Sequence, residues 1–137
     1  MAMLSANLDF STIRIFLHVL AVTVWVGGQI VMMGIMPILK EAGIDGLPAK
    51  VAKGFQNVAW PAMAVAIFTG IWNILALNSV EKTFAWNMTF GIKFLFVVAS
   101  GAGALMHSKT DDPKKKGLFG AIGFFTAIIA MFLGYVI

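Results

Sequence analysis

The chain has 137 residues, of which 60% are hydrophobic and only 12% are charged, and its mean hydropathy is +0.91. This composition is typical of an integral membrane protein. The longest connection between apolar stretches, about residues 40–54, is too short for us to expect a separate soluble domain. No cysteine is present, which excludes disulfides, iron–sulfur clusters and covalently attached c-type haem. The net charge of +4 is divided among short connections between apolar stretches, so we expect no nucleic-acid binding.

Four apolar stretches follow one another along the chain, and each is long enough for a transmembrane helix of about 20 residues. They cover about residues 12–39, 55–77, 84–106 and 118–137. The sequence therefore predicts an all-α fold, a single four-helix transmembrane bundle over residues 1–137 embedded in the lipid bilayer. The first stretch is too long for a signal-peptide core and lacks a basic leader, so we expect it to be retained.

The lysines predict how this bundle is oriented in the membrane. The first and third connections carry Lys40, Lys50, Lys53, Lys109, Lys114, Lys115 and Lys116, whereas the second connection carries only Lys82. Lysine-rich short loops stay on the cytoplasmic side, which predicts that the N-terminus and the C-terminus both lie outside. Anionic lipid headgroups are sufficient to explain the lysines at positions 114–116.

His18 lies inside the first apolar stretch, where an ionisable side chain needs a partner or a ligand. At about 1.5 Å per residue, His18 and Lys93 of the third stretch both lie roughly 10 to 14 Å below the same surface. His107 lies about 21 Å deeper than Lys93 by the same counting, so His18 and His107 cannot both ligate one haem. Three other side chains reach a depth similar to that of His18, and these are Thr69, Asn73 and Met131.

Helical periodicity places the polar and polarisable residues of each stretch on one face. In the first stretch, the side chains within about 40° of the His18 direction are Arg14, Trp25, Gln29, Met32 and Met36. Corresponding stripes consist of Ala62, Ala66, Thr69 and Asn73, and of Lys93, Ser100, Ala104 and His107. These three stripes indicate faces that pack inside a bundle. The fourth stretch differs, because its stripe of small residues indicates close helix packing, and it consists of Gly123, Ala127, Ala130 and Gly134. Trp60, Trp72 and Trp86 lie towards the ends of the stretches, where tryptophan ordinarily marks the membrane interface.

Lys93 is charged, and no apolar stretch contains an Asp or Glu to neutralise it. An anionic ligand such as a porphyrin propionate would supply the missing charge, with Arg14 as a second cation. The alternative is that Lys93 and Arg14 extend to the headgroups. His18 similarly is either a metal ligand or a hydrogen-bonded structural residue, and Trp25 packs either on a ring-shaped ligand or in the core.

The methionines support a second chemistry, because thioether sulfur suits Cu(I). Met32, Met33 and Met36 cluster near the inner end of the first stretch, and Met106 stands beside His107. Methionine is also an ordinary filler of apolar cores. Copper is therefore an alternative cofactor or cargo.

Three segments together resemble a known family. Leu17-His18 followed after six residues by Trp25-Val26-Gly27-Gly28 resembles the first-helix motif of the copper-resistance D (CopD) membrane domain and of HemJ-type protoporphyrinogen oxidases. Phe68-Thr69-Gly70-Ile71-Trp72-Asn73 is similar to the Thr-Gly-x-x-Asn segment of that family, and Phe90-Gly91-Ile92-Lys93 to the start of its third helix. The three segments span most of the first three predicted helices.

The resemblance implies a four-helix core in the bacterial inner membrane. In the HemJ branch it implies a b-type haem held by the first-helix histidine, with an essential lysine in the third helix, and these roles carry over to His18 and Lys93. In the CopD branch it implies copper movement across the inner membrane. The chain departs from HemJ proteins after the motif, where Met33-Gly34-Ile35-Met36-Pro37 replaces an arginine and an aromatic-histidine stretch.

Three functions fit these residues. The first is a haem b protein for membrane electron transfer or redox chemistry, with His18 as axial ligand, Met131 or an external group opposite, and Lys93, Arg14, Asn73 and Trp25 around the haem. The second is copper binding or transport through His18 and the methionines. The third is a non-catalytic accessory subunit of a larger membrane complex. Expected partners are the lipid bilayer and either further copies of the chain or the other subunits of such a complex. The sequence leaves the question of enzymatic activity open.

Overall fold

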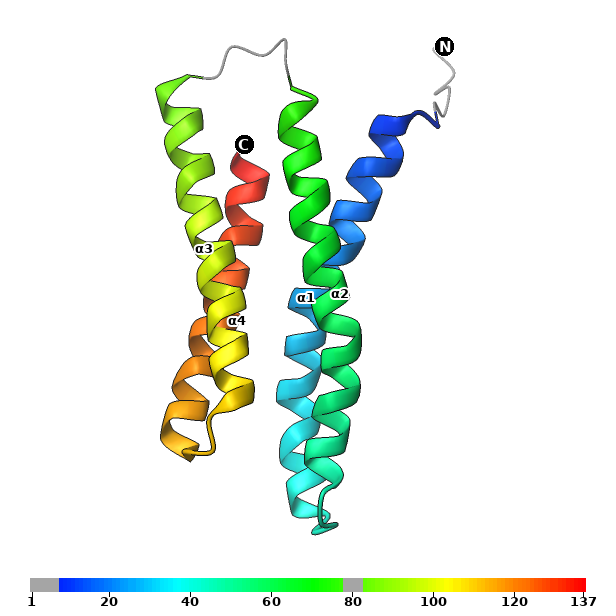
Figure 1. The fold of residues 1–137 in the computed structure, drawn as a ribbon, viewed down its shortest axis with the longest axis vertical. Helices are drawn as coiled ribbons and strands as arrows, with labels where there is room; N and C mark the ends of the chain where they lie inside the picture. The colour runs from blue at the N-terminus through cyan, green and yellow to red at the C-terminus, as the bar shows by residue number, and fades with distance from the viewer. Residues whose placement is uncertain (1–7, 78–82) are drawn as a thin grey trace. The chain divides into compact units, whose positions relative to one another are not determined.

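The computed structural model describes residues 8–77 and 83–137 and is built of long α-helices (Figure 1). The helices are α1 (Phe10–Glu41), α2 (Leu47–Leu75), α3 (Phe84–Lys109) and α4 (Pro113–Val136). Each is long and apolar enough to cross a membrane. The predicted all-α fold with four membrane-spanning helices is thereby confirmed.

The helices form two compact units, one containing α1 and α2 and the other containing α3 and α4. Each unit is an antiparallel hairpin, because partners later in one helix lie earlier in the next. In the first hairpin, Arg14 meets Asn73 and Trp25 meets Trp60. In the second hairpin, Ser100 meets Gly123 and His107 meets Lys116.

The helices extend further than the apolar stretches predicted, and the first connection is much shorter than residues 40–54. It comprises residues 42–46, where Gly43 and Gly46 adopt φ values of +68° and +76°. Such positive φ values are accessible to glycine at little steric cost. Pro48 then lies in the first turn of α2, where its missing N–H leaves no hydrogen bond unmade. Hydropathy locates the hydrocarbon-embedded part of a helix, whereas backbone hydrogen bonding continues beyond it.

The predicted interior faces of α1, α2 and α3 are confirmed. All members of these three stripes are buried or half-buried, namely Arg14, His18, Trp25, Gln29, Met32 and Met36 in α1, Ala62, Ala66, Thr69 and Asn73 in α2, and Lys93, Ser100, Ala104 and His107 in α3. In α4, Gly123, Ala127 and Ala130 are buried, whereas Gly134 is exposed. The apolar side chains between the stripes are mostly exposed, as expected of helices that face lipid.

Small residues bring α3 and α4 into backbone contact. A Cβ atom added at Gly103 would lie 2.7 Å from the backbone nitrogen of Gly123 and 2.9 Å from its Cα. At this crossing the Ser100 hydroxyl donates to the Gly123 carbonyl at 2.7 Å, and Ser100 is only 1% exposed. Close approach of this kind is how helices associate in lipid, where apolar surface alone gives little preference for protein over lipid.

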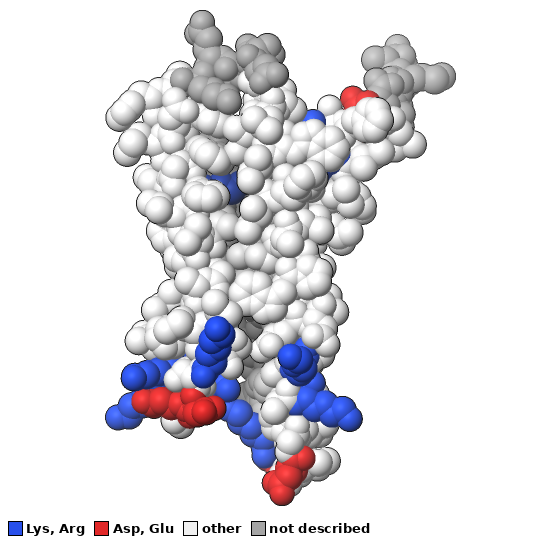
Figure 2. All heavy atoms as spheres, in the orientation of Figure 1, with Lys and Arg blue, Asp and Glu red and all other residues white. Residues whose placement is uncertain are grey.

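Charged side chains gather at the turn end of each hairpin (Figure 2). Lys40 lies in the last turn of α1, and Lys50 lies in the first turns of α2. Lys109 ends α3, and the lysines at 114–116 begin α4. These lysines therefore extend from helix ends rather than from long loops.

Substitution at the α3–α4 crossing tests this packing. Replacing Gly103 by alanine forces two backbones apart, and we expect unfolding in detergent to require about 1–3 kcal/mol less free energy. Gly91 lies on the same helix, and a Cβ added there would have no neighbouring atom within 4 Å, so Gly91→Ala should be neutral or stabilising by up to about 1 kcal/mol. Equal unfolding free energies for the two variants would contradict the close crossing.

A second test concerns the start of α1. The Asp9 carboxylate accepts hydrogen bonds from the Thr12 amide at 2.8 Å and from the Thr12 hydroxyl at 2.9 Å. The hydrogen bond from the Thr12 amide is the main cause that lowers the pKa of Asp9 below its usual value. The stabilisation of α1 by this cap is therefore fully present above the pKa that Asp9 has in the unfolded chain. It is lost as the pH falls through the pKa of Asp9 in the folded protein.

We expect the NMR signal of the Thr12 amide to shift towards the uncapped value as the pH is lowered through that range. Asp9→Asn is the matched control, because asparagine caps a helix but does not titrate. Its Thr12 signal should not follow the same titration. If the Thr12 signal titrated in the same way in the unaltered protein and in Asp9→Asn, the shift would arise from a group other than Asp9.

Candidate functional site

His18 is held against α2 by hydrogen bonds from one ring nitrogen. Its Nδ1 lies 3.0 Å from the Ala66 carbonyl oxygen and 3.0 Å from the Thr69 hydroxyl. The ring is half-buried, whereas Thr69 is only 1% exposed. His18 and Thr69 thus lie at one level of the hairpin, as counting along antiparallel spans predicts.

These two contacts determine the tautomer of a neutral His18 ring. A carbonyl oxygen only accepts, so Nδ1 must carry the proton that is directed at Ala66. The Thr69 hydroxyl donates its own proton to the Val65 carbonyl at 2.6 Å, and so it accepts from Nδ1. The lone pair of the neutral imidazole is therefore on Nε2, the nitrogen that can bind a metal.

Gly70 provides the space that this arrangement needs. A Cβ atom added at Gly70 would lie 3.2 Å from Cε1 of His18 and 3.7 Å from its Nδ1. A larger residue would press on the ring. The Thr69-Gly70 pair therefore contributes both an acceptor for the imidazole and the room beside it.

One turn before His18, Arg14 forms a second polar contact between the two helices. Its Nε donates to Oδ1 of Asn73, and its guanidinium lies 5.9 Å from the ring centroid of Trp72. Asn73 thus partners Arg14 rather than His18. Arg14 uses Nε in this contact, and its terminal nitrogens provide further donors. The guanidinium can therefore bind an anion one turn from His18.

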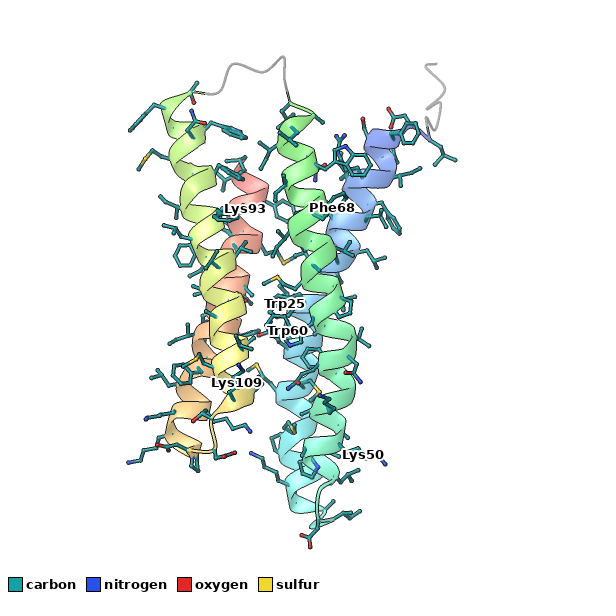
Figure 3. The ribbon with its side chains drawn as sticks, in the orientation of Figure 1. Trp25, Lys50, Trp60, Phe68, Lys93 and Lys109 are labelled. Atoms are coloured by element: carbon teal, nitrogen blue, oxygen red, sulfur yellow. The ribbon has the colours of Figure 1, made fainter. Side chains whose placement is uncertain are left out.

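On the other side of His18, aromatic packing closes the hairpin. Trp25 is buried, and its ring meets that of Trp60 edge to face with centroids 5.3 Å apart (Figure 3). Trp60 lies near the middle of α2, and its predicted position at the membrane interface stays a prediction. Gln29 donates to the Trp25 carbonyl at 3.0 Å.

Lys93 and Met131 belong to the other hairpin. The Lys93 side chain is half-buried, and its Nζ lies 3.1 Å from the position of a Cβ added at Gly134 (Figure 3). Neither α3 nor α4 contains an acidic residue. Met131 lies on α4 and is 38% exposed. Their predicted convergence on His18 stays a prediction.

Two features of the site were outside the sequence-based prediction. The Ala66 carbonyl belongs to the backbone, and no residue type marks a carbonyl as the acceptor for a distant side chain. The sequence shows a glycine at position 70, but it does not show that the His18 ring lies beside this glycine, because that contact depends on how the two helices pair. Among residues 8–77 and 83–137, no three His, Asp or Glu side chains are grouped as metal ligands.

Comparisons with protein-family models, curated proteins and solved structures give no match for this chain. The resemblance to the CopD and HemJ families stays a prediction that rests on the three motifs. The structure does bring two of these motifs into contact, because His18 of the first motif bonds Thr69 of the second. Lys93 of the third motif lies on α3 in the other hairpin.

The tautomer of His18 is directly measurable. We expect ¹⁵N NMR of the protein without added haem to show a protonated Nδ1 and an unprotonated Nε2. Thr69→Val removes one acceptor, so the Nδ1 signal should move and the unfolding free energy should fall by about 1 kcal/mol.

Thr126→Val is the matched control, because the Thr126 hydroxyl donates to the Ile122 carbonyl of its own helix. It should leave the His18 signals unchanged. A proton on Nε2 with a bare Nδ1 would contradict the hydrogen bonding described above.

Proposed function

We propose that this protein binds haem b through Nε2 of His18 and transfers electrons within the bacterial inner membrane. The observation that carries the proposal is the bond from His18 Nδ1 to the Ala66 carbonyl. Metal-binding histidines typically donate their second ring nitrogen to a carbonyl or carboxylate, which orients the ring and makes the metal-binding nitrogen more basic. His18 has this arrangement inside an apolar span.

The donor set suits haem iron better than a bare metal ion. A porphyrin already provides four nitrogen donors, and the protein needs to add only one or two axial ligands. His18 would supply one of these. The second ligand would come from outside the α1–α2 hairpin, and the bound iron would supply a one-electron redox couple.

The propionates of the haem would require cations, and we propose Arg14 for this role. It lies one helical turn from His18, about 6 Å along the helix axis, and Asn73 and Trp72 hold its side chain in place. The resulting site would lie in the outer half of the membrane, given the orientation predicted from the lysines.

Copper transport is a second candidate, because Met32 and Met36 share the interior face of α1 with His18. Met32 is fourteen residues from His18, about 21 Å along the helix. The methionines and His18 therefore cannot bind the same metal ion and would form separate binding sites along α1. Metal analysis of the purified protein distinguishes this candidate from haem binding.

An absorption spectrum tests the proposed function. We expect protein purified with haem supplementation to show a Soret band, and His18→Ala to lose most of it. His107→Ala is the matched control and should keep the band, because His107 lies near the end of α3 and its ring is bonded to the Lys116 carbonyl. Absence of the band from the unaltered protein, or an unchanged spectrum in His18→Ala, would contradict the proposal.

A further inference from the structure

An open hollow of about 430 Å³ lies at the turn end of the α3–α4 hairpin. It is lined by Met106, Lys109, Thr110, Lys115, Leu118 and Phe119. None of these six described side chains is acidic, although Asp111 and Asp112 belong to the same turn. The hollow contains none of the residues proposed to hold haem.

The lining residues change from basic to apolar with distance from the turn. On α3, Met106 lies about 4.5 Å further from the turn than Lys109, and on α4 Phe119 lies about 6 Å further from it than Lys115. Both helices therefore place a lysine near the turn and apolar surface beyond it. In two membrane-spanning helices joined by residues 110–112, the turn lies at headgroup level and the apolar residues lie beside the acyl chains.

Local hydrogen bonds hold the two walls of the hollow together. His107 Nδ1 donates to the Lys116 carbonyl at 2.7 Å, and the His107 ring fits beside Gly120. Asp112 caps α4 by accepting from the Lys114 amide at 3.0 Å. The last turn of α3 and the first turn of α4 are thus joined, which keeps the backbones of Lys109 and Lys115 at the same level.

We propose that this hollow binds one anionic phospholipid. The phosphate would lie between the ammonium groups of Lys109 and Lys115, and an acyl chain would lie along Met106, Leu118 and Phe119. Lysine ammonium groups at the membrane surface attract anionic headgroups, and exposed apolar side chains immediately below them match the acyl region. Free inorganic phosphate would use only the basic half of the hollow, so the apolar half favours a lipid.

Native mass spectrometry of the full-length protein in neutral detergent tests this proposal, with phosphatidylglycerol or phosphatidylcholine added. We expect phosphatidylglycerol to be retained preferentially. The double variant Lys109→Gln/Lys115→Gln should bind it roughly 10- to 30-fold more weakly, given the usual contribution of a lysine at a lipid surface. Lys114→Gln/Lys116→Gln removes the same charge from outside the hollow and should weaken binding much less.

Three outcomes would overturn the proposal. Equal weakening by the two double variants would show a general electrostatic attraction rather than a site. Equal retention of the two lipids by the unaltered protein would remove the role of the anion, and this result requires no variant to fold. Complete displacement of phosphatidylglycerol by excess inorganic phosphate would show that the apolar wall contributes nothing.

Discussion

In both hairpins, a polar side chain of one helix donates to a backbone carbonyl of the other where a glycine leaves room. His18 reaches Ala66 beside Gly70, and Ser100 reaches Gly123 at the Gly103 crossing. This pattern follows from the hydrocarbon that surrounds membrane-spanning helices. Hydrocarbon offers no hydrogen bonds, so the helices satisfy their own backbone groups, and the carbonyls retain a second lone pair that a neighbouring side chain can use.

The same pattern has different consequences in the two hairpins. In the α3–α4 hairpin, the Ser100 hydroxyl has one proton and its bond to Gly123 is structural. In the α1–α2 hairpin, the donor is an imidazole, which has a second nitrogen. Once Nδ1 has donated to Ala66, the chemistry of His18 resides on Nε2. The bond to the Ala66 carbonyl is therefore compatible both with a structural role of His18 and with its proposed role as a metal ligand.

The two proposed ligands use different parts of the chain. Haem would use the interior faces of the spans, where Arg14 and His18 are half-buried. The anionic lipid would use the turn end of the second hairpin, where Lys109 and Lys115 are exposed. This separation follows from the cost of burying charge. Most lysines lie at helix ends, and Lys93 and Arg14 stand apart from them within the predicted spans.

The sequence by itself determined the all-α class, the four spans and the interior face of each of the first three helices. These properties depend on composition and on the 3.6-residue period, which are local. Helix ends were less accessible, because hydropathy does not report where hydrogen bonding stops, and the first connection was predicted too long for that reason. Only the tertiary structure decided that Arg14 pairs with Asn73, that His18 donates to the Ala66 carbonyl, and that Gly70 makes room for its ring. These contacts depend on the rotation and axial register of one helix against another, which no local pattern encodes.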